Sequence, residues 1–320
     1  MSSPFLDVCN NYNMGINMLW ENDSVKNNLL FNFPISVTQR LSELHSIKSS
    51  KNLIPELKKI FDAAKNGSEP HKLFLGDLLL SFHHPDVIKN NESGKQLEKK
   101  FEKIFNAKRN DDHKQVVDLE LLGIERFDLN EDAKRKLISN CQAKPDLVFN
   151  DGSLLSLKCG IESNTEINLG SFEFLNIIYP PKFAQFRNLK ERKRKENIHG
   201  FNCGLGSPAL LKNTSDALKK AGLFEDFVDR FQTLFSAVYR DDLFFYHKNS
   251  SEFSMWLLPH KELQNIIYNN VLNGFKNIRW EGNSIRSSSM SEMISRSQRI
   301  NYRFEEVLDF NFLIDHFSKS

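Results

Sequence analysis

Apolar residues recur at helical spacing along most of the first 110 residues, which predicts a mainly helical N-terminal region. The period is clearest over residues 37–47, 53–67 and 94–110. Gly67 and Gly94 are natural boundaries of these helices.

A further helix is predicted over residues 130–143, with Asn130 as its N-cap and two acidic residues in its first turn. After this helix, the spacing of apolar residues changes from the helical period to alternation at every second residue. Residues 144–160, KPDLVFNDGSLLSLKCG, have the alternation of two short antiparallel strands joined by a turn. Helices followed by such a strand pair and more helices indicate an α/β or α+β fold.

The remainder of the chain mixes both patterns. Residues 167–179 are expected to return onto the sheet of the hairpin and to end at the Pro180–Pro181 pair. Two helices (207–222 and 223–240) and another β region (243–259) are expected next, before 45 residues of short strands and Ser- and Arg-rich loops. We divide the chain into a helical region (1–110), a core with the hairpin (111–180) and a basic α+β region (181–320), a division also compatible with one continuous domain.

Composition narrows the class of protein. With 40% hydrophobic and 26% charged residues among 320, the chain is ordinary for a globular protein, and a net charge of +2 implies no particular partner. The four cysteines form no CxxC pair, so neither a disulfide framework nor a zinc site is expected. We find no secretory signal, and the apolar run 73–82 is broken by Asp77 and too short to cross a membrane. A soluble, cytoplasmic protein is expected.

The turn of the hairpin decides which side chains share a face. A two-residue loop would pair Asp146 with Leu157 and bury its carboxylate among leucines. A three-residue loop pairs Asp146 with Ser156 and puts Gly152 where a left-handed backbone is needed. The second register is favoured, because it sorts Leu147, Phe149, Leu155 and Leu157 onto one face. The other face then holds Asp146, Val148, Leu154, Ser156 and Lys158.

Asp146 and Lys158 have two explanations. One is an exposed cross-strand ion pair, worth about 0.5 kcal/mol. The other is a functional site, which two observations favour. Apolar residues occupy both faces, so the sheet is expected to be covered, and Pro145 holds the chain extended before the carboxylate.

These residues resemble the PD-(D/E)xK nucleases, a family that includes many type II restriction endonucleases. The family signature is Pro-Asp opening one strand, then an acidic residue, any residue and lysine on the next. Pro145–Asp146 and Ser156–Leu157–Lys158 occupy those places, and residues 159–175 are similar to the loop and helix that follow the lysine. The resemblance covers about 35 residues, and its motif is short. It implies a restriction-endonuclease-like α/β core with a central mixed sheet flanked by helices.

Ser156 departs from the family pattern, which has an aspartate or glutamate there. A hydroxyl is a weak magnesium ligand, so either one ion binds with more water or another carboxylate substitutes. The candidate substitutes are Glu162, Glu166, Glu120 and Glu125. An inactive member of the family is a further alternative.

A literal match to the motif occurs elsewhere, at Pro85–Asp86 and Glu98–Lys99–Lys100. The second part has helical periodicity, and on a helix the side chains of Glu98 and Lys100 point about 200° apart. We therefore expect a solvated helix face there and place the site at the hairpin.

The resemblance implies a mechanism. Asp146 would be the principal Mg²⁺ ligand, with the Leu157 carbonyl as a second and Glu162 as a further candidate. Lys158 would orient and help deprotonate the attacking water and balance charge on the scissile phosphate. Asp146, Ser156 and Lys158 would thus form the catalytic site.

Two basic stretches could hold DNA. Residues 182–195 carry a local charge of +6 beside two phenylalanines, from Lys182, Arg187, Lys190, Arg192, Lys193, Arg194 and Lys195 against a single glutamate. A solvated basic segment is the alternative to phosphate binding. Residues 279–303 contribute Arg279, Arg286, Arg296, Arg299 and Arg303, which suit bidentate contact with guanine edges, although a polar surface loop explains them too.

Other polar features are interpreted as structural. His83, His84 and His260 lack partners at metal spacing, and the glycine-rich residues 200–206 lack a phosphate-binding fingerprint. Trp20, Trp256 and Trp280 are most simply core or interface residues.

The sequence thus predicts a bacterial, cytoplasmic, Mg²⁺-dependent type II restriction endonuclease acting on double-stranded DNA. By resemblance it would be a homodimer, with a cognate methyltransferase in the same system. A repair or recombination nuclease and a non-catalytic DNA-binding protein are the alternatives.

Overall fold

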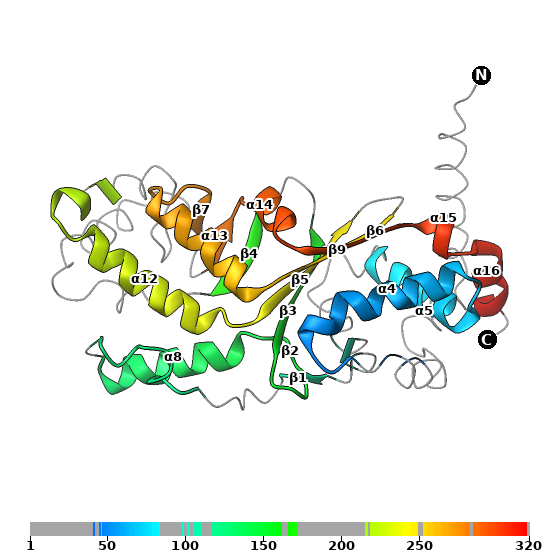
Figure 1. Cartoon of the computed structure of the whole chain (residues 1–320), viewed down its shortest axis with the longest axis horizontal. Coiled ribbons are helices and arrows are strands. Elements are labelled where there is room, and N and C mark those ends of the chain that lie inside the picture. Colours follow the sequence, from blue (N-terminus) through cyan, green and yellow to red (C-terminus); the bar gives the residue numbers. More distant parts are fainter. Residues whose placement is uncertain are drawn as a thin grey trace, which may run out of the picture.

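A six-stranded mixed sheet with helices on both faces forms the centre of the protein in the computed structural model (Figure 1). The structure describes residues 41, 45, 47–83, 98, 101–102, 105, 107–110, 117–127, 129–161, 166–171, 215–216, 218–248, 252–281 and 284–318. The predicted α/β class, with a mixed central sheet flanked by helices, is confirmed.

The strand order of this sheet is β1-β2-β3-β5-β6-β9. The strands are β1 (Lys108–Arg109), β2 (Leu147–Val148), β3 (Leu154–Ile161), β5 (Asp242–Lys248), β6 (Glu252–Leu258) and β9 (Gln298–Arg303). Within it, β3 and β5 run parallel and every other neighbouring pair is antiparallel.

The hairpin has the predicted register. Leu147 lies opposite Leu155, and Val148 lies opposite Leu154. The turn closes with the Phe149 N–H donating to the Ser153 carbonyl at 2.9 Å, and Gly152 has the left-handed φ of +82°. The three-residue loop is therefore confirmed.

One face of the sheet packs against α4 (Leu53–Lys65) and α5 (Glu69–His83). The shorter helices α15 (Phe304–Val307) and α16 (Phe310–Ser318) lie at the same end of the molecule (Figure 1). The apolar residues of α4 recur at helical spacing and are buried, as predicted. Their core also contains the four apolar hairpin residues that the register places together: Leu147, Phe149, Leu155 and Leu157.

The opposite face packs against α8 (Glu131–Ala143), α12 (Phe224–Val238), α13 (His260–Leu272) and α14 (Met290–Ser295). Helix α8 begins as predicted, because the Asn130 side chain accepts a hydrogen bond of 2.9 Å from the Ala133 N–H. Residues 98, 101, 102 and 105 are helical, which supports a helical setting for Glu98.

A second sheet of three strands has the order β4-β8-β7. It consists of β4 (Ile167–Ser171), β8 (Ser284–Ser287) and β7 (Ile278–Glu281). The prediction that residues 167–179 return onto the hairpin sheet is wrong for β4, and the likeness to a helix is wrong for the same five residues; residues 172–179 lie outside the described part of the chain. Strand β3 already has β2 and β5 as neighbours, so β4 instead pairs with β8 and buries Ile167 and Leu169 in the second core.

No helix in the described part of the chain is both long and apolar enough to cross a lipid bilayer.

Candidate active site

Asp146 lies directly before β2, in the extended chain that follows Pro145. Its Oδ2 accepts a hydrogen bond of 2.6 Å from the Leu157 N–H, and its own N–H donates to the Leu155 carbonyl at 2.9 Å. The pairing of the hairpin therefore fixes both the backbone and the carboxylate. Oδ1 makes no hydrogen bond with any residue that the structure describes.

Asn110 forms hydrogen bonds with the backbone of the segment that leads from α8 to Asp146. Its side-chain amide donates to the carbonyls of Gln142 (2.6 Å) and Pro145 (2.9 Å), and its N–H donates to the Asp146 carbonyl (3.0 Å). Asn110 thus joins the end of α8 to the start of β2. Asn110 is not predictable as part of the site, because nothing in the local sequence relates residue 110 to the hairpin.

The charge of Asp146 is influenced by its surroundings. Burial raises the pKa of the carboxyl group, whereas the Lys158 ammonium and the Leu157 N–H lower it, and the carboxylate of Asp241 raises it further. The net result is a pKa above the usual value. Lys158 is the strongest positive influence, as expected from its place on the same face of the hairpin. Its amine forms no ion pair with a described residue.

Ser156 lies opposite Asp146 and has no charge to replace that of the missing acid. It is 2% exposed, and its hydroxyl donates to the Lys144 carbonyl at 3.2 Å. This hydrogen bond fixes the segment that leads to Asp146. We therefore assign Ser156 a structural role.

The side chain of Lys144 extends from the segment before the hairpin to the second sheet. Its Nζ donates to the Leu169 carbonyl in β4 and lies 4.0 Å from the centre of the Tyr239 ring. Burial lowers the pKa of the amine to about 7, a shift that Asp241 opposes and Lys158 reinforces. A Cβ on Gly170, which has φ +89°, would lie only 2.9 Å from this nitrogen, so glycine leaves room for the contact.

The candidate substitutes for the missing acid differ in position. Glu166 accepts from Arg279 Nε, and Glu120 and Glu125 are exposed. None of these three is among the groups that shift the pKa of Asp146, and Glu162 lies outside the described residues. The carboxylate that does influence Asp146 belongs to Asp241, directly before β5, which the sequence analysis missed.

The described residues contain no group of three or more His, Cys, Asp or Glu side chains arranged to hold a metal ion. Oxygen donors at the site come from Asp146 and from the Leu157 carbonyl. In an extended strand the N–H and C=O of one residue point to the same side. The Leu157 carbonyl therefore points to the side on which its N–H meets Asp146.

The predicted DNA-binding residues fall into two groups. The lysine-rich stretch, 182–195, lies outside the described residues. Arg279 and Arg286 lie opposite each other in the second sheet, whereas Arg299 and Arg303 belong to β9 and Arg296 lies at the end of α14, just before that strand. Arg296 pairs with Glu262 and Glu292, Arg303 pairs with Glu305, and the Arg299 guanidinium lies 5.8 Å from the centre of the Trp256 ring.

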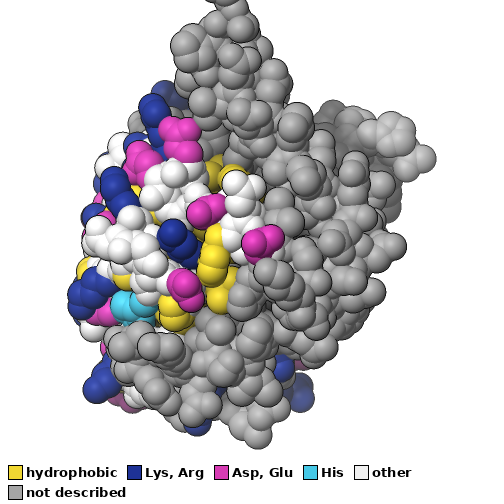
Figure 2. Space-filling view, turned by 90° about the vertical axis from the view of Figure 1, so that its right-hand side faces the viewer, with side chains coloured by type: hydrophobic (Ala, Val, Ile, Leu, Met, Phe, Trp, Pro, Cys, Tyr) yellow, Lys and Arg dark blue, Asp and Glu magenta, His cyan; other side chains and the backbone are white. Residues whose placement is uncertain are grey.

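The end of the molecule that carries α4 and α16 has no basic patch among its described side chains. Figure 2 shows lysines and arginines interspersed with acidic residues on this face. Lys59 pairs with Glu56 at 2.6 Å, and Lys65 pairs with Glu306 at 3.2 Å. The described side chains of this face therefore do not form the single-sign potential that attracts nucleic acid.

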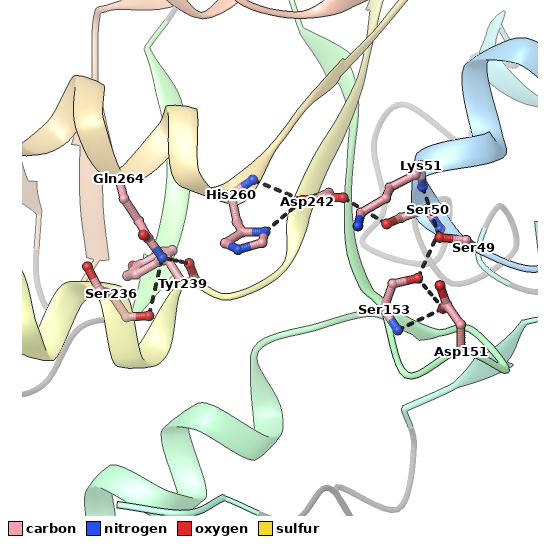
Figure 3. A network of polar contacts seen from close by, with 10 residues as sticks. All are labelled: Ser49, Ser50, Lys51, Asp151, Ser153, Ser236, Tyr239, Asp242, His260 and Gln264. Carbon is pink, nitrogen blue, oxygen red and sulfur yellow. Dashed lines mark hydrogen bonds and ion pairs between the residues drawn. The ribbon is translucent and has the colours of Figure 1, made fainter. Parts of the chain in front are cut away.

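A separate polar network is centred on Asp242, the first residue of β5 (Figure 3). Oδ2 accepts from the Ser50 hydroxyl at 2.7 Å, and Oδ1 accepts from the N–H and the Nδ1 of His260, both at 2.9 Å. Ser50, in the short helix η1 (Ser50–Asn52), also donates its N–H to Ser153 of the hairpin turn. His260 thus has a structural role, as predicted.

Gln264 of α13 makes a second set of hydrogen bonds nearby. Its side-chain amide donates to the carbonyls of Ser236 (3.3 Å) and Tyr239 (2.7 Å) at the end of α12 (Figure 3). These bonds fix Tyr239, whose ring lies under the Lys144 amine.

Comparisons of the chain with protein-family profiles, with curated proteins and with solved structures find no match.

Proposed function

We propose that this protein is a Mg²⁺-dependent endonuclease of the restriction type, which hydrolyses phosphodiester bonds of double-stranded DNA at a short specific sequence. The observation that carries the proposal is the pairing of the hairpin. It places Asp146 beside Lys158 on one face, with the carboxylate fixed by the Leu157 N–H. The likeness to the PD-(D/E)xK nucleases rests on the same residues, and the mixed sheet is compatible with such a core.

The donors at the site fit a magnesium ion that retains several waters. Mg²⁺ prefers hard oxygen ligands and is commonly held by one or two carboxylates together with phosphate. Asp146 Oδ1 and the Leu157 carbonyl are the protein ligands in this proposal, whereas the hydroxyl of Ser156 is committed to the Lys144 carbonyl. When bound, the ion would polarise the phosphoryl oxygen and stabilise the charge that develops on the leaving group.

Lys158 is the proposed catalytic cation. Its amine is near enough to Asp146 to lower the pKa of that carboxyl group, and it has no described partner to compete for it. An ammonium in this position orients the attacking water and balances the negative charge of the scissile phosphate.

Binding of the duplex is assigned to the two basic stretches. Three of the described arginines, Arg279, Arg296 and Arg303, are held by exposed or half-exposed ion pairs. Such pairs are worth at most about 1 kcal/mol, so phosphates can replace the glutamates at little cost. The lysine-rich stretch would supply sequence-independent affinity and the arginines sequence preference. The homodimer and the cognate methyltransferase follow from the resemblance alone.

Incubation of the purified protein with supercoiled plasmid and Mg²⁺ tests the proposal, with EDTA as the metal-free control. Discrete fragments are expected in Mg²⁺, and Asp146→Ala and Lys158→Ala should each reduce cleavage at least about a hundredfold. Asp229→Ala and Lys136→Ala are matched controls, because both residues form ion pairs on exposed helix surfaces away from the site. These two variants should cleave like the wild type.

Three results would contradict the proposal in different ways. Wild-type cleavage by Asp146→Ala or Lys158→Ala would exclude this site. Indiscriminate or structure-directed nicking would support a repair or recombination nuclease. A gel shift of duplex DNA without cleavage would support a non-catalytic DNA-binding protein.

A further inference from the structure

The burial of the Asp241 carboxylate is not explained by its hydrogen bonds. It is 3% exposed, and its Oδ1 is buried with no hydrogen-bond partner among the described residues. Burying an ionised carboxylate without a partner costs several kcal/mol, so such groups are normally paired or bound to a metal ion.

The strand pairing places Asp241 on the same face as the site. Because Asp242 lies opposite Leu155 in the parallel pair, Asp241 is level with Leu154. Side chains alternate along a strand, so Asp242 faces α4 and Asp241 faces the side of Ser156 and Lys158. Asp241 also influences the pKa values of Lys144, Asp146 and Tyr239 electrostatically, in agreement with this placement.

The nearby amines do not neutralise Asp241 directly. The Lys144 amine donates to the Leu169 carbonyl and stacks on the Tyr239 ring, and it forms no ion pair with Asp241 in the described structure. Lys158 likewise forms no such pair. A buried carboxylate oxygen that has no protein donor and lies on the same face of the sheet as a second carboxylate is a suitable ligand for a divalent cation.

We propose that Asp241 supplies the second carboxylate of a divalent-cation site with Asp146, in place of the acid that Ser156 does not provide. The choice of Mg²⁺ as the physiological ion rests on the proposed function, but the site itself is defined by these side chains. Asp146 and Asp241 come from opposite sides of β3, so the cation would lie across this strand, on the face that also carries Lys158.

Direct measurement of cation binding tests this inference without relying on catalysis. Mn²⁺ is a suitable probe, because the free ion can be followed by electron paramagnetic resonance during titration of the metal-free protein. Asp241→Asn and Asp146→Asn should each weaken Mn²⁺ binding at least tenfold. Asp229→Asn, on the exposed surface of α12, should bind Mn²⁺ like the wild type.

The alternative is that Asp241 only balances the charge of Lys144. Asp241→Asn would then leave Mn²⁺ affinity unchanged, which would overturn the inference. Asp241→Ser serves as a second variant if the asparagine variant does not fold, and it should show the same loss of binding. The fold of each variant is checked by circular dichroism and urea unfolding.

Failure of this inference can be distinguished from failure of the proposed function. If Lys158→Ala abolishes DNA cleavage while Asp241→Asn binds Mn²⁺ and cleaves like the wild type, only the inference is wrong. If Mn²⁺ binding requires both aspartates but the wild type cleaves no DNA, the cation site stands and the nuclease proposal falls.

Discussion

Asp241 and Asp242 are adjacent in sequence and both almost fully buried, but their surroundings differ completely. Asp242 receives three hydrogen bonds, from Ser50 and from the backbone and ring of His260. These bonds, with the charge of His260, outweigh burial and lower the pKa of Asp242. In Asp241, by contrast, one carboxylate oxygen has no hydrogen-bond partner among the described residues. The charge of Asp241 also contributes to the raised pKa of Asp146. Fully paired polar groups specify a fold, whereas under-satisfied ones are available to a ligand.

Asp242→Ala should have the largest effect on stability. It removes the acceptor of three hydrogen bonds, so the free energy of unfolding should fall by about 3 kcal/mol. The contribution of Asp242 is fully present above the usual pKa of 3.8 and is lost as the pH falls through the lowered pKa. Urea unfolding at pH 7 and pH 3.5 measures both effects. An equal loss of stability in Asp241→Asn would remove the contrast between the two aspartates.

Lys144→Met should change how stability depends on pH. The pKa of Lys144 is lowered from 10.5 to about 7, so above neutral pH the unfolded chain binds a proton that the folded protein does not. Stability of the wild type should therefore rise between pH 7 and pH 9 relative to the variant, by about 2 kcal/mol. Parallel urea titrations at the two pH values test this. Identical pH dependence in the two proteins would mean that the amine is charged where it lies.

Asp146→Asn should raise stability by less than this amount when divalent cations are removed with EDTA. The folded-state pKa of Asp146 is raised, so ionisation disfavours the folded protein as the pH rises above 3.8. The gain should be absent at pH 3.5 and present at pH 7, as measured by thermal unfolding. A residue that is costly to the fold and needed for activity is typical of a functional site. Destabilisation at neutral pH would instead indicate a structural carboxylate.

Local chemistry made part of the structure predictable from sequence. The register of the hairpin follows from Gly152 and from the sorting of apolar residues, and the start of α8 follows from Asn130. Both signals lie within a few residues of the feature that they determine. Asp146 and Lys158 could be placed together for the same reason.

Other features depend on contacts between distant segments. Asp241 reaches the site because β5 pairs parallel with β3, and no pattern near residue 241 indicates this. Helix α5 was not predicted, because it is apolar on several sides and its apolar residues therefore show little helical periodicity. The wrong placement of β4 has the same origin, since the second strand of its sheet comes from residues 284–287.

The parallel pairing of β3 with β5 also has a consequence during synthesis of the chain. The hairpin can form as soon as Ile161 has left the ribosome, but its neighbour begins only at Asp242. Until then one edge of β3 lacks that neighbour, and such edges invite aggregation while non-local pairing is slow. The two aspartates of the proposed cation site are also made far apart in time. Under the proposed function, a nascent chain that has only the first of them would lack a complete cation site and could not yet cleave DNA.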